Sequence, residues 1–354
     1  MRVLHLPYNI ASQISITVRA LRRLGVDARG LVLNGADLQD DKDIENHRVG
    51  LPIWRHPLRS SRESIQWFQA FRSAVHWADV VHWHYTVSNW PFHWDLRTIA
   101  RLNKPRLVEF WGTDIRDPEL ACIDNPYLSN LIREKEAYAI SSRSSLAVQK
   151  AFSDAGFTCL IPGPELFDYL RSDLFPEPIR TEAAVQVSEI KTAYPDPDKA
   201  KPVVGHIPSR PKVKGTETVL AAVQSLAGQC DFEFRLIQNV THAQALEQIR
   251  ECDVVLDQFI IGSYGTVSLE AMALGKPVLC YIKPSFYKRL PDEFPIVNAN
   301  PGDLTRTLKG LLVDGRLRHS IGLKSREYAE RHHDALVVAE QMVGIYRRLM
   351  KSGT

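Results

Sequence analysis

Short apolar runs alternate with helical patterns along the whole chain. In the first half, apolar residues that recur at intervals of three and four predict helices over 12–25, 64–78 and 96–102. Strands are predicted around them at 3–6, 30–34, 80–84 and 106–110, with weaker strand candidates at 139–140 and 159–161. Strands and helices that alternate with short connections predict a parallel sheet with crossover helices.

The same alternation returns in the second half, after a proline-rich stretch. Strands are predicted at 203–208, 232–237 and 253–256, and helices at 216–226, 243–251 and 266–274. Between the halves, prolines at 162, 164, 176, 178, 195, 197 and 202 interrupt any long regular element. We therefore expect an α/β protein of two doubly wound, Rossmann-like domains that face each other across a cleft, where ligands bind at the carboxyl ends of the strands.

This organisation gives four predicted segments. An N-terminal domain covers 1–165, a linker 166–200 and a C-terminal domain 201–335, and a helix at 336–354 crosses back to the first domain. A chain of 354 residues is long enough for two such domains, each with its own core.

Composition narrows the function classes only slightly. The net charge of +3 is too small to argue for a nucleic-acid partner. The five cysteines are scattered without a CxxC pair, which favours a reduced, cytoplasmic compartment over disulfides or structural zinc. We expect neither a signal peptide nor a membrane span.

The phrase GSYGTVSLEAMALGKPVLCYI, at 262–282, predicts a turn, a helix and a strand in succession. Gly262 and Gly265 permit a tight turn, and the free N–H groups at the start of the following helix suit a phosphate. Glu270, the one acidic residue of the phrase, lies about one turn into that helix. Two roles stay open for it: contact with a ribose diol beside the phosphate, or complementing the helix dipole.

A basic loop precedes another predicted helix in PSRPKVKGTETV. Arg210 and Lys214 follow the end of a predicted strand, so both side chains would project toward the ligand side of the sheet. Two cations beside a helix start suit a diphosphate and would stabilise it as a leaving group. The alternative is an ordinary solvated basic loop.

Together, HIPSRPKVKGTETVLAA and SYGTVSLEAMALGKPV resemble the C-terminal domain of the GT-B retaining glycosyltransferases grouped as family four. The resemblance is specific over 203–282. It implies that Arg210 and Lys214 act on the donor diphosphate as catalytic groups, and that Glu270 holds the nucleotide ribose. Gly262 departs from the family pattern, because the first glutamate of that pattern would fall there. The resemblance also implies backbone contacts to the diphosphate from Gly265, Thr266 and Val267. Ser263 and Tyr264 are the candidates to replace the missing glutamate near the sugar. Three further donor-side candidates lie at strand ends, where such domains bind the base or the sugar: Asn239, Asp257 and Gln258.

The N-terminal half is expected to bind the acceptor. Its segment EFWGTDIRDP resembles the strand-to-loop segment of the same family, with Trp111 where that family often has histidine. Asp114 is either a catalytic carboxylate near the acceptor hydroxyl or the acceptor of an Asx turn or helix cap. The remaining acceptor-side predictions are Asn9, Gln13, His84, Trp111, Gly112 and Thr113.

The motif HWH at 82–84 is a weak metal candidate. Two histidines on one strand face lack an obvious carboxylate or a third ligand in the sequence. We expect His84 to face the cleft and His82 to be a strand residue with satisfied hydrogen bonds, and no metal site.

The resemblance implies a glycosyltransferase that transfers a sugar from a UDP- or GDP-linked donor to a hydroxyl, with retention and without metal or cofactor. The expected acceptor is a glycan or lipid-linked glycan of cell-envelope biosynthesis. Tryptophans at 83, 90, 94 and 111 and the aromatic and arginine residues of 62–72 leave peripheral contact with the inner face of the membrane open. Two alternatives are a sugar-nucleotide epimerase with the same fold and a non-catalytic nucleotide-sugar-binding subunit of a glycosylation complex.

Overall fold

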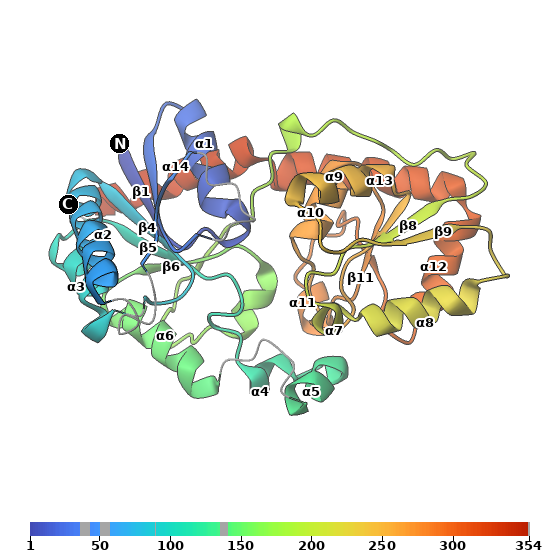
Figure 1. The fold of residues 1–354 in the computed structure, drawn as a ribbon, viewed down its shortest axis with the longest axis horizontal. Helices are drawn as coiled ribbons and strands as arrows, with labels where there is room; N and C mark the ends of the chain where they lie inside the picture. The colour runs from blue at the N-terminus through green and yellow to red at the C-terminus, as the bar shows by residue number, and fades with distance from the viewer. Residues whose placement is uncertain (36–42, 50–56, 89, 135–140, 353–354) are drawn as a thin grey trace. The chain divides into compact units, whose positions relative to one another are not determined.

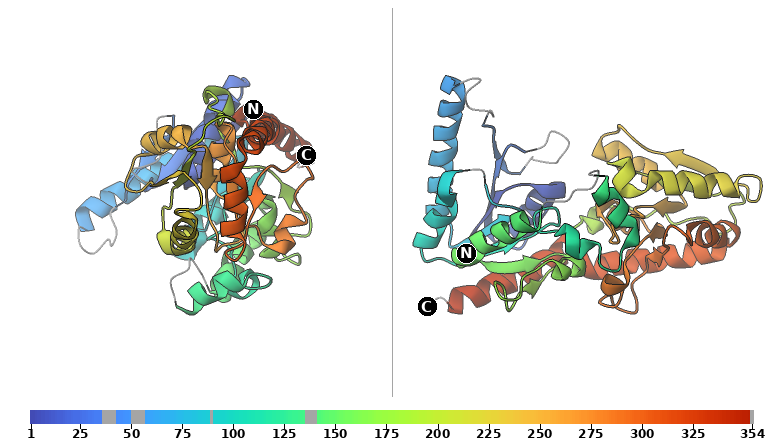
Figure 2. Two further views of the ribbon diagram at one scale, coloured as in Figure 1. Left: turned by 90° about the vertical axis from the view of Figure 1, so that its right-hand side faces the viewer. Right: turned by 90° about the horizontal axis from the view of Figure 1, so that it is seen from below.

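The structure, a computed structural model, describes residues 1–35, 43–49, 57–88, 90–134 and 141–352. The chain divides into two compact units. The first comprises Met1–Arg116, Ile140–Ala184 and Ala335–Thr354, and the second Asp117–Ala139 and Val185–Asp334. Both chain ends therefore belong to the first unit, as Figures 1 and 2 show.

The first unit is built on a seven-stranded parallel sheet in the order β3-β2-β1-β4-β5-β6-β7. Its strands are β1 (Arg2–Pro7), β2 (Asp27–Leu33), β3 (Glu45–His47), β4 (Val80–His84), β5 (Arg106–Glu109), β6 (Thr158–Ile161) and β7 (Ile179–Arg180). Its helices are α1 (Gln13–Arg23), α2 (Pro57–Trp77), α3 (Trp94–Arg101), α6 (Ser142–Asp154) and α14 (Ala335–Ser352).

Helices α1 and α14 pack together against one face of this sheet (Figure 1). Val3, Val80 and Leu107 on three neighbouring strands form a core with apolar residues of both helices. Because side chains alternate between the two faces of a strand, His5, His82, His84 and Glu109 lie on this same face, nearer the carboxyl ends. The face of the sheet that α1 and α14 cover is thus apolar toward the amino ends of the strands and polar toward their carboxyl ends.

The second unit has a five-stranded parallel sheet in the order β12-β11-β10-β8-β9. Its strands are β8 (Val203–His206), β9 (Glu233–Leu236), β10 (Val254–Leu256), β11 (Val278–Cys280) and β12 (Val297–Asn298). Its helices are α4 (Pro118–Ala121), α5 (Pro126–Arg133), α7 (Pro211–Lys214), α8 (Thr216–Leu226), α9 (His242–Glu251), α10 (Thr266–Ala273), α11 (Pro284–Tyr287), α12 (Leu304–Val313) and α13 (Gly315–His332).

The predicted fold class of two doubly wound parallel sheets is confirmed. The division of the chain differs from the predicted bounds in two places. Strand β7 lies inside the predicted linker and pairs with β6, so the first unit extends to Ala184. The segment 117–139 belongs to the second unit. Helix α14 belongs to the first unit, to which the C-terminal helix is expected to cross back. The predicted strand at 139–140 lies outside the described residues.

Segment 117–139 joins the second unit through a buried amide. The side chain of Asn125, which is fully buried, donates to the carbonyls of Ile260 and Ile261, both at 2.9 Å. The neighbouring Asp124 accepts from the backbone N–H of Ser285 at 2.7 Å. These contacts span more than a hundred residues of sequence, so no local pattern predicts them.

None of the described helices is long and apolar enough to cross a membrane.

Candidate functional site

A buried carboxylate organises the carboxyl end of the sheet in the second unit. Asp257 follows β10 directly and is 1% exposed. Its Oδ1 lies 2.9 Å from the Lys214 ammonium, and its Oδ2 accepts from Gly265 N at 2.8 Å and Ser268 Oγ at 2.7 Å. Burial raises the pKa of Asp257, but Lys214 and these hydrogen bonds outweigh burial and leave the pKa below its ordinary value.

Lys214 therefore lies beside the first turn of α10. An ammonium has three N–H donors, and the ion pair to Asp257 uses one of them. Gly265 precedes the helix without a side-chain cap, so the first N–H groups of α10 are available to an acceptor. A Cβ at Gly265 would lie 3.1 Å from Lys214 Nζ, so glycine allows the ammonium to approach the helix start.

Glu270 has a partner that the sequence did not suggest. Its Oε1 lies 2.6 Å from Nε2 of His242, the first residue of α9. The Glu270 side chain is 17% exposed, whereas that of His242 is 61% exposed. Glu270 lies beyond the first turn of α10, and the effect of the helix dipole on a charge falls off within that turn. The position of Glu270 therefore fits a carboxylate that is held in place better than it fits a dipole role.

The other predicted donor residues occupy different surroundings. Arg210 precedes α7 and is exposed, as is Asn239, which has a positive φ of 56°. Gln258 and Ser263 are buried, and the Gln258 amide donates to the Ser263 carbonyl. Tyr264 stacks on Phe286 at a ring-centroid distance of 5.7 Å. Thr266 and Val267 form the first turn of α10.

The structure shows what surrounds Gly262, the position where the resemblance places a glutamate. Gly262 has φ +83°, a conformation that side chains disfavour. A Cβ there would also lie 3.0 Å from Asn125 Nδ2 and 3.0 Å from Lys283 Cβ. Lys283 and Asn125 occupy the adjoining space, so a glutamate side chain at this position would have to displace them.

In the first unit, Asp114 is the centre of the loop after β5. Its carboxylate is 2% exposed and accepts from the backbone N–H groups of Trp111, Gly112 and Ile115 at 2.7–3.2 Å. Burial raises the pKa of Asp114 to about 6, although these N–H groups lower it. Of the two roles predicted for Asp114, these hydrogen bonds are those of the acceptor in a turn. Its catalytic role near the acceptor hydroxyl stays a prediction. Thr113 bonds to the Tyr85 hydroxyl at 2.8 Å.

Two predicted acceptor residues have structural partners. Asn9 is 3% exposed, and its Oδ1 accepts from Ile14 N at 2.9 Å near the start of α1. The Gln13 amide forms two 2.9 Å hydrogen bonds with the backbone of Ala184. Both side chains are thus used inside the unit, and their acceptor role stays a prediction.

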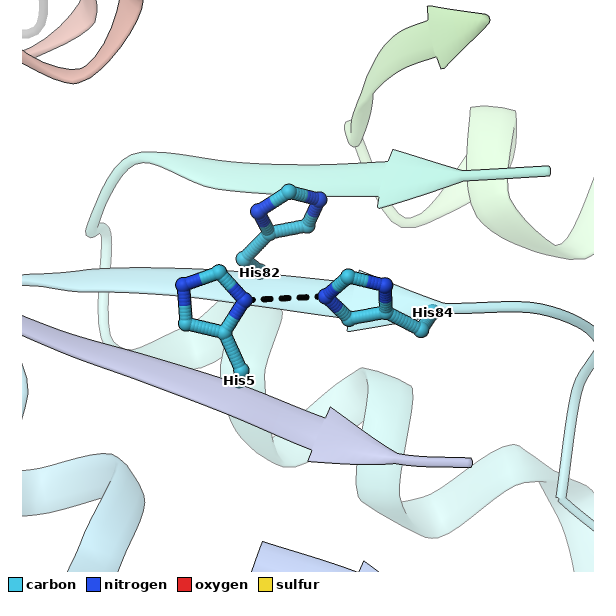
Figure 3. A group of neighbouring side chains, drawn as sticks. All are labelled: His5, His82 and His84. Carbon is cyan, nitrogen blue, oxygen red and sulfur yellow. Dashed lines mark hydrogen bonds between the residues drawn. The ribbon is translucent and has the colours of Figure 1, made fainter. Parts of the chain in front are cut away.

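His84 belongs to a buried cluster instead of lying open to a ligand. It is 1% exposed, lies parallel to the Trp111 ring at 6.4 Å, and bonds through Nε2 to Nδ1 of His5 at 2.9 Å (Figure 3). His82 is buried beside it. Burial lowers the pKa of His84 to about 3, and burial raises the pKa of the adjacent Glu109 to about 8.

Three participants are not singled out by the sequence pattern: His242, Glu109 and His5. Asp257 is predicted at a strand end, where such domains bind the base or the sugar, but not as the partner of Lys214. The position of Asp257 just after a buried strand was a usable signal. The other three depend on which strands and helices become neighbours.

The chain is similar to known proteins in its fold but not in its sequence. No family model matches the sequence, and no curated protein sequence matches it. Several solved structures do match in shape. Sucrose-phosphate synthase of Thermosynechococcus elongatus has a TM-score of 0.67 at 14% identity, covering 99% of this chain and 100% of that one.

Two further structures agree along their whole length. A glycosyltransferase of Rickettsia africae has a TM-score of 0.62 at 12% identity and covers 99% of this chain and 98% of that one. HepE of Anabaena, solved with UDP, has a TM-score of 0.60 at 14% identity and covers 98% and 100%.

The chain has the GT-B fold. Within this GT-B fold, the predicted donor residues all belong to the second unit and the predicted acceptor residues to the first.

Proposed function

We propose that the chain is a glycosyltransferase that takes its sugar from a nucleotide-diphospho-sugar. The observation that supports this most is the ammonium of Lys214, held by Asp257 at 2.9 Å beside the uncapped start of α10. A fixed cation and free backbone N–H groups at a helix N-terminus together suit a diphosphate. The GT-B fold of HepE, which was solved with UDP and with UDP-glucose, agrees with such a ligand.

In this proposal the diphosphate contacts the first turn of α10. Lys214 donates to its oxygens with the N–H groups that Asp257 leaves available, and Arg210 adds a second cation. As the bond to the sugar breaks, negative charge grows on the departing diphosphate. A cation already held in position stabilises that charge without reorganisation.

Glu270 is proposed to bind the ribose. Its Oε1 is fixed by His242, so its Oε2 is aimed and can accept from a ribose hydroxyl. A carboxylate held by a neighbour loses less freedom on binding than a mobile one. The pairing with His242 therefore supports the ligand role over the dipole role.

The finer features are part of the proposal. Transfer retains the anomeric configuration, the donor is UDP- or GDP-linked, and a hydroxyl of a glycan or lipid-linked glycan is the acceptor. Transfer itself requires no metal. Because Gly262 lacks the glutamate that the resemblance places there, Ser263 and Tyr264 are the side chains proposed to contact the sugar.

Equilibrium binding tests the proposal. Isothermal titration of the full chain with UDP, GDP and ADP is expected to show one tight nucleotide. Arg210→Ala should weaken its binding roughly tenfold or more, since a hydrogen bond to a charged group contributes about 1.5–3 kcal/mol. Lys212→Ala is the matched control, because Lys212 is an exposed cation of the short helix that Arg210 precedes.

We expect the control to bind within about twofold of the wild type. If no nucleotide binds at millimolar concentration, the donor-site proposal is wrong. If the two variants lose affinity equally, Arg210 acts only through general charge.

A further inference from the structure

Four polar side chains meet at the carboxyl ends of three neighbouring strands in the first unit. They are His5 of β1, His82 and His84 of β4, and Glu109 of β5. In the strand register His5 lies opposite His82, and His84 lies opposite Glu109. All four are at most 3% exposed, and each of the three imidazoles offers a nitrogen within 4.8 Å of the others (Figure 3).

Two imidazole nitrogens of this cluster face one carboxylate oxygen. Nε2 of His82 and Nδ1 of His84 are buried and lack a hydrogen-bond partner among the described residues. They lie 3.6 and 3.1 Å from Oε2 of Glu109, but without hydrogen-bond geometry. Around a tetrahedral zinc ion with bonds of ~2.0–2.1 Å, adjacent ligand atoms lie about 3.3 Å apart. The two distances lie on either side of that value.

The far side of each of these groups is held by another residue. Nε2 of His84 bonds to Nδ1 of His5 at 2.9 Å. Nδ1 of His82 bonds to the Tyr346 hydroxyl at 2.7 Å, and that hydroxyl also lies 3.4 Å from Nε2 of His5.

Glu109 is held in the same way, because its Oε1 accepts from Thr181 Oγ1 at 3.3 Å. Metal-binding histidines and carboxylates are usually oriented in this manner by hydrogen bonds on the side away from the ion.

Charge also favours a cation here. Glu109 is 3% exposed, and no lysine or arginine among the described residues pairs with it. A buried carboxylate without a counter-charge is unfavourable. A divalent ion between Glu109 and two neutral imidazoles would supply the missing positive charge. Nitrogen and carboxylate ligands suit zinc and the neighbouring first-row metals.

We propose that Nε2 of His82, Nδ1 of His84 and Oε2 of Glu109 bind a divalent ion of the zinc class. His5, Tyr346 and Thr181 orient these three ligands. The rings of His82 and His84 stack at 18°, so binding turns one of them until its lone pair points at the ion. Because every ligand is buried, the ion joins β4 to β5 as a structural element. This site is independent of the proposed donor site, which belongs to the other unit.

Metal content of the intact protein tests the site. Since burial blocks entry from solution, the full chain is expressed with zinc, or refolded with cobalt(II), and then desalted. Elemental analysis should find about one ion per chain, and the cobalt protein should show the visible absorption of a four- or five-coordinate site. The apparent Tm should rise by roughly 5 °C or more over metal-free protein.

Variants assign the ligands. His84→Ala and Glu109→Gln should lose the stoichiometric ion, whereas His5→Asn should weaken binding about 10–100-fold, as loss of an orienting group does. His206→Asn is the matched control. His206 is a fully buried strand histidine of the other unit whose ring nitrogens both have partners, at 2.8 and 2.9 Å. This control should keep the ion.

Wild-type protein without stoichiometric metal, after both loading routes, would overturn the proposal without recourse to any variant. Retention of the ion in folded Glu109→Gln would equally contradict it.

Discussion

The two units each bury a carboxylate at the carboxyl end of a parallel sheet, and the two carboxylates are compensated differently. Asp257 is 1% exposed and pairs with the Lys214 ammonium, so its pKa lies below the ordinary value. Glu109 is 3% exposed and faces two imidazoles instead of a cation, so burial raises its pKa to about 8. Equal burial is therefore accompanied by pKa shifts in opposite directions, because the partners of the two carboxylates differ.

This difference separates two kinds of buried acid. Asp257 holds a cation and a helix start at the carboxyl end of the sheet, where an anionic ligand can contact both. Glu109 lies on the face of the sheet that α14 covers, near Tyr346 and within 3.6 Å of His82 and His84. A buried carboxylate therefore indicates which kind of ligand binds only when the group that balances its charge is also known.

The largest expected effect is on the stability of the second unit. Lys214→Met leaves Asp257 buried without its cation and should lower the free energy of unfolding by about 3 kcal/mol. Urea unfolding measures this, and Lys212→Met in the same helix is the control, with an expected change below about 0.5 kcal/mol. Equal stability of the two variants would show that the Lys214–Asp257 pair is not needed to compensate Asp257.

Gly262→Glu introduces the side chain that the resemblance places at this position. It should destabilise the second unit by about 2–3 kcal/mol, from the positive φ and from contact with Asn125 and Lys283. Gly228→Glu is the matched control, because Gly228 has φ +79° and nothing within 4 Å of a Cβ. It should show only the backbone cost of about 1–2 kcal/mol. A stable Gly262→Glu variant would show that Asn125 and Lys283 do not keep a larger side chain out of this position.

Glu270→Ala tests the remaining acid of the donor site. It should weaken nucleotide binding roughly tenfold to a hundredfold, because a hydrogen bond to a carboxylate is lost. His242→Ala, which removes the observed partner, should change affinity less than about threefold. Unchanged affinity in Glu270→Ala would refute ribose binding by Glu270. An equal loss of affinity in Glu270→Ala and His242→Ala would mean that the pair only links α9 to α10.

The smallest effect is expected in the first unit. In metal-free protein, Glu109→Gln should change the free energy of unfolding by less than about 1 kcal/mol, because it leaves no cation unpaired. Asp257→Asn should cost about 2 kcal/mol, because it leaves Lys214 without its partner. Similar costs for both substitutions would remove the distinction between the two carboxylates.

Local patterns predicted the elements and part of the site. Strand β4 and helix α8 begin and end where periodicity placed them, at 80–84 and 216–226. Lys214 and Gly265 were identified because a strand end and a helix start are visible in sequence. Strand β7 was missed, since two residues among prolines give no periodic signal.

The partners could not be predicted, because they come from distant parts of the chain. Glu270 and His242 are 28 residues apart, and His5 and His84 are 79 apart. Each pair meets only once the order of strands is set. Similarly, the sequence showed that Gly262 lacks the expected side chain, but not that Asn125, from the first half of the chain, occupies the space.

Turnover of nucleotide sugars tests the central claim most directly. The full chain is incubated with UDP-, GDP- and ADP-sugars, with and without hydroxyl acceptors, and the products are followed by NMR at the anomeric carbon. We predict slow release of free sugar from one donor class, faster transfer with an acceptor, retention at the anomeric centre, and loss of both reactions in Arg210→Ala. Binding without turnover in every mixture, or an epimerised donor without acceptor, would contradict a glycosyltransferase.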